Sequence, residues 1–368
     1  MRGARAALVS LASVLFLTAA APHAGVRSID VPEGWFDEVF APPTEEEIAA
    51  ARADFGEGFS CPRFEIKEEL RGDDAAEAAG SGTQVNGIEY ESAGLNVTGL
   101  MAAPAEGGPF PVIILNHGGF SGITRYDLIT MTELAERGYV VLASTYRGEE
   151  GLAGESEGEM DVLGGEVTDV LNLVECAKRL EGTTGRVGML GGSHGGGITL
   201  LALERGGGVD AAVTFAAPAD MFNAGNRKLA QDWVTNPGRQ EMMLALFMTD
   251  DALKRMKAVF GWTGGEPAPV QEVRRNLLMR SALYFVERIE TPLLFFYGER
   301  DPVVSVEDAR RLAERLEEHG KEFDYRIFPG QGHSLTDEKK REAYAMVHEF
   351  FDALLKGGAA APGGADRF

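Results

Sequence analysis

The chain has 368 residues, of which 44% are hydrophobic and 25% are charged, which is the balance of an ordinary globular protein. The formal net charge of −22 at pH 7 argues against nucleic acid or an anionic membrane surface as a partner, because both are negatively charged. The length allows one large α/β domain with an appendage, or two domains.

Residues 1–24 have the order of a secretory signal peptide. Arg2 and Arg5 precede an apolar run over residues 6–17, and small residues follow as far as Ala24. The apolar run is too short for a comfortable membrane span. We therefore predict a secreted or periplasmic protein with no stable membrane partner, and an uncleaved anchor is the alternative.

Residues 25–82 are irregular, with a Pro pair and an acidic run, and a short helix is predicted over Thr44–Ala53. This stretch is too short for a large second domain, so we expect an N-terminal extension that packs over the core. It contains Cys61, and the chain has one other cysteine, Cys176. A bridge between them would require an oxidising compartment. Because Cys176 falls in a helix-like segment, we predict a buried apolar residue there instead. Neither cysteine has a zinc-site partner, so no metal site is predicted.

Residues 83–355 show strands that alternate with helices. Two alternating runs on either side of Ser92-Ala93-Gly94 predict a β-hairpin. Further strands are predicted at 111–115, 139–143, 187–190, 209–215, 292–297 and 323–328, and helices at 127–137, 167–180, 198–204, 306–319 and 338–355. This alternation predicts a mostly parallel sheet with helices on both faces, in which the active site lies beyond the carboxyl ends of the strands.

Residues 217–286 interrupt the alternation. They are rich in Met, Trp and Phe and contain no strand-like run. We predict a helical insertion that forms a lid beside the active site, and a plain extension of the core is an equal alternative. The last residues, 356–368, are dominated by Gly and Ala and are predicted to be disordered.

The stretch Gly191-Gly-Ser-His-Gly195 follows a strand and precedes a helix, which is typical of a nucleophile elbow. A nucleophilic Ser193 needs a strained backbone there, and side chains at positions 191 and 195 would collide with it. A Gly-rich turn with an incidental serine is the alternative. A phosphate loop is disfavoured, because no Gly-Lys-Ser/Thr follows the strand.

Two later loops offer a base and a carboxylate for this serine. Asp301 and His333 each come soon after an apolar strand, so we expect both side chains at the same sheet edge as Ser193. The order Ser193, Asp301, His333 is that of an α/β-hydrolase triad. The alternatives are a helix cap at Asp301, a surface histidine at His333, and Glu299 as the carboxylate. His194 lies too near Ser193 in the chain to bend back as the base.

Acyl transfer also needs hydrogen-bond donors for an oxyanion. One predicted donor is the backbone N–H of His194, the residue after the nucleophile. The other should come from Asn116-His117-Gly118-Gly119-Phe120, which follows an early strand. We predict the amide of Gly119, with Gly118 or Phe120 as alternatives, and a structural role for the His117 side chain.

The sequence resembles the catalytic domain of the prolyl oligopeptidase family, including its acylaminoacyl-peptidase-like members, and it is similar to dienelactone-hydrolase-like enzymes. The resemblance covers residues 82–355 and rests on His117-Gly-Gly119, Thr145-Tyr-Arg-Gly148, Gly191-Gly-Ser-His-Gly-Gly196, Tyr297-Gly-Glu-Arg-Asp301 and Gly332-His333. It implies an α/β-hydrolase fold, no cofactor and the triad Ser193, Asp301 and His333. Peptidases of this family carry a β-propeller before the catalytic domain, and residues 26–82 are too few to build one.

We therefore expect a serine hydrolase that acts through an acyl-enzyme on carboxylic esters of small or medium apolar substrates. The Met, Phe and Trp residues of 217–286 favour an apolar pocket. Arg147, Glu149 and Glu150 lie on a loop at the catalytic edge, but no anchor for a substrate charge can be assigned. An aminopeptidase or acylaminoacyl-peptidase-like enzyme acting on short peptides is the second hypothesis, and a non-catalytic binding protein on the same fold is the third.

Overall fold

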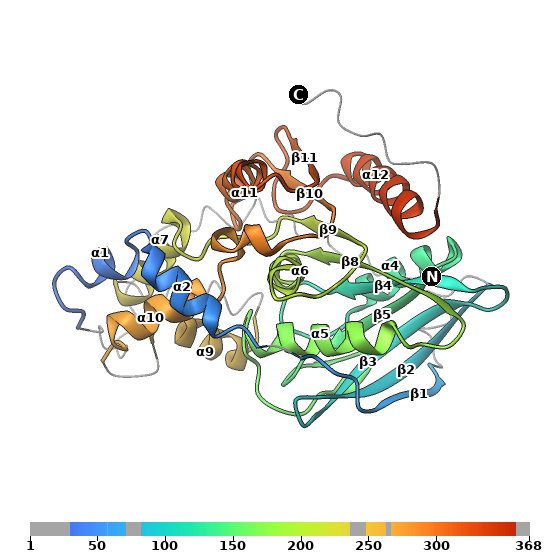
Figure 1. The fold of residues 1–368 in the computed structure, drawn as a ribbon. Coiled ribbons are helices and arrows are strands. Elements are labelled where there is room, and N and C mark those ends of the chain that lie inside the picture. The colour runs from blue at the N-terminus through green and yellow to red at the C-terminus, as the bar shows by residue number, and fades with distance from the viewer. Residues whose placement is uncertain (1–29, 57, 71–81, 236–247, 263–265, 358–368) are drawn as a thin grey trace, which may run out of the picture.

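The computed structural model describes residues 30–56, 58–70, 82–235, 248–262 and 266–357 (Figure 1). The predicted signal segment at 1–24 and residues 358–368 of the predicted tail lie outside these ranges. Within the described ranges, no helix is both long and apolar enough to cross a membrane.

The described strands build one nine-stranded sheet in the order β1-β2-β3-β5-β4-β8-β9-β10-β11, and β6 and β7 form a separate two-stranded ribbon. Strands β1, β2 and β3 are antiparallel to their neighbours, and the six strands from β5 to β11 are parallel. The strands are β1 Phe64–Glu69, β2 Thr83–Ser92, β3 Leu95–Pro104, β4 Phe110–Asn116, β5 Val140–Thr145, β6 Glu150–Gly151, β7 Gly154–Glu155, β8 Thr183–Gly192, β9 Ala211–Phe215, β10 Leu293–Gly298 and β11 Phe323–Phe328. The predicted mostly parallel α/β sheet is confirmed, and β1 was not predicted because its exposed, charged sequence lacks an apolar face.

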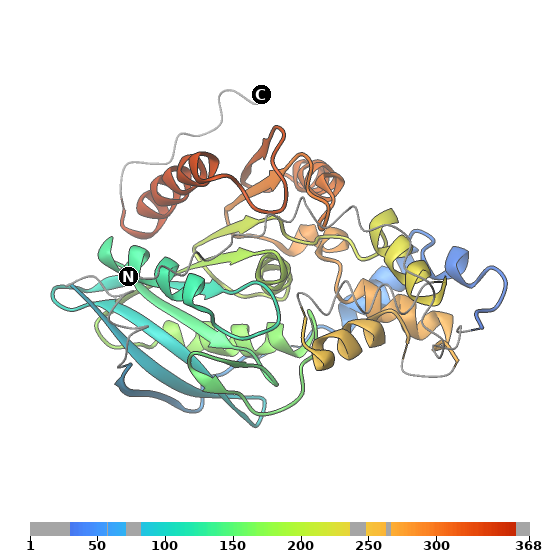
Figure 2. The same cartoon turned by 180° about the vertical axis from the view of Figure 1, so that it is seen from behind.

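Helices cover both faces of the sheet, as Figures 1 and 2 show from opposite sides. Successive β4 residues alternate between two apolar cores: Val112 and Ile114 pack with α5 and α6, whereas Ile113 and Leu115 pack with α4 and α12. The covering helices are α4 Arg125–Glu136, α5 Gly165–Ala177, α6 His194–Glu204, α11 Val306–Glu318 and α12 Asp337–Leu355. Helix α6 begins four residues earlier than predicted, because three glycines at its start hid the apolar period.

A group of helices at one end of the sheet, the helical lobe, comprises α1, α2, α7, α9 and α10 (Figure 1). Their bounds are α1 Trp35–Val39, α2 Glu45–Ala53, α7 Ala224–Thr235, α9 Asp250–Val259 and α10 Val270–Leu278. The lobe therefore joins the N-terminal extension to the segment between β9 and β10. Trp233, Phe260 and Trp262 are buried in it, and the ring of Trp262 contacts that of Trp35 in a tilted arrangement, with ring centroids 5.0 Å apart. These three aromatic residues therefore belong to a buried core. The predicted role of residues 217–286 as a lid stays a prediction.

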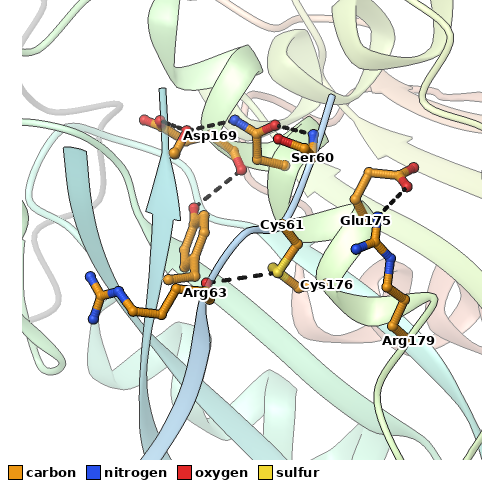
Figure 3. Close-up of a disulfide and its surroundings, with 10 residues drawn as sticks. Ser60, Cys61, Arg63, Asp169, Glu175, Cys176 and Arg179 are labelled. Atoms are coloured by element: carbon orange, nitrogen blue, oxygen red, sulfur yellow. Dashed lines mark hydrogen bonds and ion pairs between the residues drawn. A yellow bond between two sulfur atoms is a disulfide. The ribbon is translucent and has the colours of Figure 1, made fainter. Parts of the chain in front are cut away.

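A disulfide joins Cys61 of the N-terminal extension to Cys176 of α5 (Figure 3). The sequence analysis favoured an unpaired, buried Cys176, and that prediction is wrong. The two cysteines are separated by 115 residues in the chain, so only the packing of the extension along α5 brings them together. One turn earlier in α5, the Asn172 side chain accepts a hydrogen bond of 2.9 Å from the Ser60 amide, which fixes the same alignment.

Candidate active site

Ser193 lies at a sharp turn between β8 and α6. Its φ of 52° and ψ of −120° place a non-glycine residue in a rarely occupied backbone region. The turn is tight on both sides: a Cβ at Gly191 would lie 2.2 Å from the carbonyl oxygen of Gly195, and a Cβ at Gly195 would lie 2.0 Å from that of Asn116. Only glycine fits at these two positions, and the helix can therefore begin directly beneath the end of β4.

Three predicted residues meet at this turn although they come from distant loops. The Nε2 atom of His333 lies 2.9 Å from the Oγ of Ser193, and the Nδ1 atom of His333 lies 2.8 Å from the Oδ2 of Asp301. Asp301 follows β10, and His333 follows β11. Because an Asp carboxylate accepts the proton on Nδ1, Nε2 is left free to accept the hydroxyl proton of Ser193.

The Asp301 carboxylate is fixed by backbone donors. Its Oδ1 accepts the amide N–H groups of Val303 at 2.8 Å and Val304 at 3.0 Å, and its side chain is fully buried. Glu299, the alternative carboxylate, instead accepts the amide N–H of Gly330 at 2.8 Å. The structure therefore brings Asp301, and not Glu299, to His333.

The loop that contains the predicted oxyanion donor Gly119 passes close to Ser193. A Cβ at Gly118 would lie 3.6 Å from the Cβ of Ser193, so the loop after β4 passes alongside the nucleophile. Gly119 has φ of +73°, and its N–H has no hydrogen-bond acceptor among the described residues. His194 is the first residue of α6, where an amide has no acceptor inside the helix. Both amides are thus available for an oxyanion.

Two buried glutamates that sequence reasoning did not identify face the histidines of this site. Glu166 contacts the ring of His194, and Glu149 contacts the ring of His117, with all four side chains at most 5% exposed. Neither glutamate carries a local pattern that predicts such a partner. The expected structural role of His117 agrees with its place between Glu149 and the stacked ring of Tyr146.

Two of the three charged residues noted on the loop after β5 make structural contacts. The guanidinium of Arg147 donates two hydrogen bonds to the buried Asp169 of α5, at 2.9 Å and 2.7 Å. Glu149 is buried, as described above. Of the three charged residues noted on this loop, Glu150 alone is exposed.

This geometry can be compared with known proteins. The family model described as "Prolyl oligopeptidase family" matches residues 125–358, which is more than half of the chain and includes Ser193, Asp301 and His333. The chain belongs to the prolyl oligopeptidase family. As a member of this family it is an enzyme of the serine hydrolase class.

Among its relatives is the "Uncharacterized peptidase YtmA" of Bacillus subtilis (strain 168), which is 28% identical over 265 residues, or 72% of this chain and 91% of that protein. The "Dipeptidyl aminopeptidase BIII" of Pseudoxanthomonas mexicana is 28% identical over 262 residues. That alignment covers 70% of this chain but 35% of the relative, so this prolyl oligopeptidase family member matches about a third of that enzyme's length.

Solved structures show the same fold at low sequence identity. Acetyl xylan esterase 1 from Thermoanaerobacterium sp. JW/SL YS485 superposes with a TM-score of 0.58 at 18% identity, covering 87% of this chain and 95% of the esterase. The Pyrococcus horikoshii acylaminoacyl peptidase superposes with a TM-score of 0.57 at 19% identity, covering 78% of this chain and 43% of the peptidase. The predicted α/β-hydrolase fold is thereby confirmed.

Proposed function

We propose that this enzyme hydrolyses carboxylic esters through an acyl-enzyme, with Ser193 as nucleophile, His333 as base and Asp301 as its orienting carboxylate. The observation that carries the proposal is the continuous chain of contacts from Asp301 through His333 to Ser193, at 2.8 Å and 2.9 Å. A serine hydroxyl is a weak nucleophile alone, and this arrangement is the one that activates it.

In the proposed mechanism, the Oγ of Ser193 attacks the ester carbonyl carbon while the Nε2 of His333 takes the hydroxyl proton. The carbonyl π electrons move to oxygen, and the N–H groups of Gly119 and His194 stabilise the resulting oxyanion. Asp301 stabilises the imidazolium of His333. Collapse of the intermediate breaks the bond to the alcohol oxygen, which receives the proton from His333. Water then repeats the sequence and releases the acid and free Ser193.

Two cavities lie near the helical lobe, and because neither is lined by Ser193, Asp301 or His333, they do not decide between ester and peptide substrates. One cavity, of about 380 Å³, is lined by Glu159 and Asp161 among others, and the second is lined by Asp54 and Asp161. Each of these carboxylates forms an ion pair with an arginine, at 2.8 Å for Glu159, 2.6 Å for Asp161 and 2.7 Å for Asp54. These cavities offer no unpaired carboxylate to a substrate ammonium group.

A peptidase acting on short peptides is the second candidate. It is favoured by the names of the relatives, since two that align over at least 70% of this chain are called a peptidase and a dipeptidyl aminopeptidase. The near full-length overlap with an acetyl xylan esterase favours the first candidate. The same triad can hydrolyse esters or peptides, so the two candidates are distinguished by measuring which substrates the enzyme hydrolyses.

The test is a parallel screen of nitrophenyl esters with aminoacyl and N-acyl-aminoacyl nitroanilides, using purified protein. We expect kcat/KM for the best ester to exceed that for every nitroanilide by at least about tenfold, or about 1.4 kcal/mol. Nitroanilides that are cleaved as efficiently as the best ester would replace the esterase proposal with the peptidase. A Ser193→Ala sample screened in parallel shows which activity belongs to this site.

We also propose a secreted or periplasmic location. The Cys61–Cys176 disulfide supports it, because such bridges persist in oxidising compartments and are rare in the cytosol of most organisms. The charge and apolar pattern of residues 1–24 supports it independently. Fractionation of cells that express the full chain with a C-terminal tag would find the protein in the cytosol if this proposal is wrong.

A further inference from the structure

The side chain of His194 contacts two groups that sequence analysis did not connect with it. Its Nε2 lies 2.6 Å from the Oε2 of Glu166, and its Nδ1 lies 3.0 Å from the carbonyl oxygen of Gly119. Glu166 is fully buried in the first turn of α5, and its Oε2 also accepts the amide N–H of Leu163 at 3.0 Å. The Glu166 side chain therefore links α5 to the residue after the nucleophile.

These contacts determine where the protons lie. A carbonyl oxygen can only accept a hydrogen bond, so the Nδ1 of His194 must carry a hydrogen and donate it to Gly119. The short contact at Nε2 then requires one further proton, which belongs either to Glu166 or to His194. In both cases the pair is neutral overall. Rotation of the imidazole ring about its Cβ–Cγ bond would break the hydrogen bonds to Gly119 and Glu166.

The pKa directions of the two partners agree with a retained proton. Burial, aided by the charge of Glu149, raises the pKa of Glu166 overall, although the charge and the hydrogen bond of His194 act to lower it. Burial lowers the pKa of His194, but attraction to Glu166, the hydrogen bond between them, and the contributions of Glu149 and the Gly119 carbonyl together raise it. Each group thus holds a proton more firmly than it would in water.

The carbonyl that His194 holds belongs to the proposed oxyanion loop, residues 117–122. The carbonyl of Gly119 shares a peptide plane with the N–H of Phe120 and directly follows the N–H of Gly119. A Cβ at Gly119 would meet no atom within 4 Å, so the space on that side of the residue is open. The bond from His194 is consequently a principal restraint on the loop at this point.

The preceding carbonyl has the same kind of contact. The Nδ1 of His117 lies 3.2 Å from the carbonyl oxygen of Gly118, and its Nε2 lies 3.3 Å from the Oε2 of Glu149. That carboxylate also accepts the amide N–H of Gly122 at 2.9 Å. Two consecutive carbonyls of the loop thus face the Nδ1 of a histidine whose other nitrogen faces a buried glutamate.

We propose that Glu166 is a positioning residue that holds the His194 ring so that its Nδ1–H fixes the Gly119 carbonyl, and with it the amides that bind the oxyanion. The inference rests on the proposed function. His194 then has two roles in the oxyanion site. Its backbone N–H donates to the oxyanion, and its side chain fixes the loop that supplies the second donor.

Two variants of His194 separate positioning from packing. Asn places an amide N–H near the former Nδ1 and can still donate to Gly119, whereas Gln places its amide near the former Nε2 and contacts Glu166 only. Both keep the backbone N–H of residue 194. We expect His194→Asn to have a kcat for nitrophenyl acetate at least about tenfold above that of His194→Gln, with KM values within about threefold of each other.

Two variants of Glu166 provide a matched pair. Gln can donate to the Nε2 of a neutral His194, whereas Leu cannot. We expect Glu166→Leu to lower kcat by about 10- to 100-fold, which is part of the loss seen when one oxyanion donor is removed. The kcat of Glu166→Gln should be at least about tenfold higher than that of Glu166→Leu. Should the Leu variant not fold, the two His194 variants decide the question alone.

A trifluoromethyl ketone supplies a readout that a packing role would not change. Its adduct with Ser193 places an oxyanion between the same amides, so its Ki should rise in the four variants in proportion to the fall in kcat. Equal kcat and Ki for His194→Asn and His194→Gln would overturn the proposal, as would losses in the Glu166 variants that only follow the folded fraction measured by circular dichroism.

The outcome can be separated from failure of the proposed function. If the unmodified enzyme shows no Ser193-dependent hydrolysis, the proposed function itself fails. The proton assignment is then still tested by ¹⁵N NMR of histidine-labelled protein, using His194→Asn to assign the signal. A ring hydrogen on Nδ1 of His194 agrees with the inference, and its absence at pH 7 overturns it.

Discussion

Gly195 faces the carbonyl oxygen of Asn116 so closely that a Cβ on Gly195 would lie 2.0 Å from it. We expect Gly195→Ala to force β4 and α6 apart, with a loss of about 3 kcal/mol in the free energy of unfolding and disruption of the nucleophile turn. The control is Gly192→Ala, whose new Cβ would meet the Cβ of Phe215 at 4.0 Å. Urea unfolding of both variants tests this, and equal midpoints would contradict it.

The proposed nucleophile gives the second prediction. Ser193→Ala should lower kcat by about 10⁴- to 10⁶-fold with little change in thermal stability, because the hydroxyl contacts His333 at the surface of the turn and supports no core packing. A fluorophosphonate should label the unmodified protein and not the variant. Labelling that persists in Ser193→Ala would refute the assignment of the nucleophile.

The Cys61–Cys176 bridge closes a loop of 115 residues, and loop-closure entropy predicts a stabilisation of about 3–5 kcal/mol for a loop of this size. We expect a Cys61→Ser, Cys176→Ser double variant to lose that amount in urea unfolding. A reducing agent should destabilise the unmodified protein to the same extent and leave the double variant unaffected. If a thiol reagent titrates two free cysteines in the unreduced, unfolded protein, the bridge does not exist.

Arg274 is the main polar contact between α10 and the N-terminal extension. Its guanidinium binds both carboxylate oxygens of Glu47, at 2.6 Å and 2.7 Å, and its side chain is 7% exposed. The Arg274 guanidinium also donates to backbone carbonyls of the extension, so Arg274→Ala should cost about 2–3 kcal/mol through these lost hydrogen bonds and allow proteolysis within residues 30–56. The matched control is Arg275→Ala, whose exposed pair with Asp54 should cost at most about 1 kcal/mol.

The same contact predicts an acid sensitivity of the extension. The hydrogen bond from Arg274 lowers the pKa of Glu47 from 4.5 to about 2. A carboxyl group whose pKa is lowered by folding contributes stability above its unfolded pKa, and that contribution is lost as the pH falls from about 4.5 toward 2. Proteolysis of residues 30–56 by pepsin should therefore accelerate over this range. Glu47→Gln should be cleaved at a rate that depends less on pH.

Glu204 should make the stability of the fold depend on pH in the opposite direction to Glu47. It is fully buried at the end of α6, neither carboxylate oxygen has a hydrogen-bond partner among the described residues, and burial raises its pKa to about 8. Between pH 4.5 and 8 the folded protein holds a proton that the unfolded chain has released, so stability falls as the pH rises.

Glu204→Gln should remove this dependence. We expect the variant to gain stability relative to the unmodified protein by up to about 1 kcal/mol per pH unit between pH 5 and 8. Urea unfolding at four pH values measures the difference, with the exposed Glu314→Gln as the control. A difference that does not change with pH would show that Glu204 titrates normally.

The catalytic candidates could be predicted from sequence because each depends on local order. Ser193 stands between two required glycines after an apolar strand, and Asp301 and His333 follow β10 and β11, the last two parallel strands of the sheet. Parallel strands bring their carboxyl ends to one edge, so strand order alone placed the three residues near one another. The contact distances then follow from the register of β8, β9, β10 and β11.

Sequence did not predict the partners that depend on how separate elements pack. In the sequence, Glu166 and Glu149 look like ordinary surface charges. In the fold, both are buried in contact with His194 and His117. The Cys61–Cys176 bridge likewise depends on the path of the extension along α5. Strand and helix periods specify which face of an element is buried, whereas the orientation of one element on another is set by side-chain packing over the whole core. The sequence by itself therefore determined the parallel strands of the sheet, the turn at Ser193 and the order of the triad, and only the tertiary structure decided which buried charges and which sulfur atoms meet.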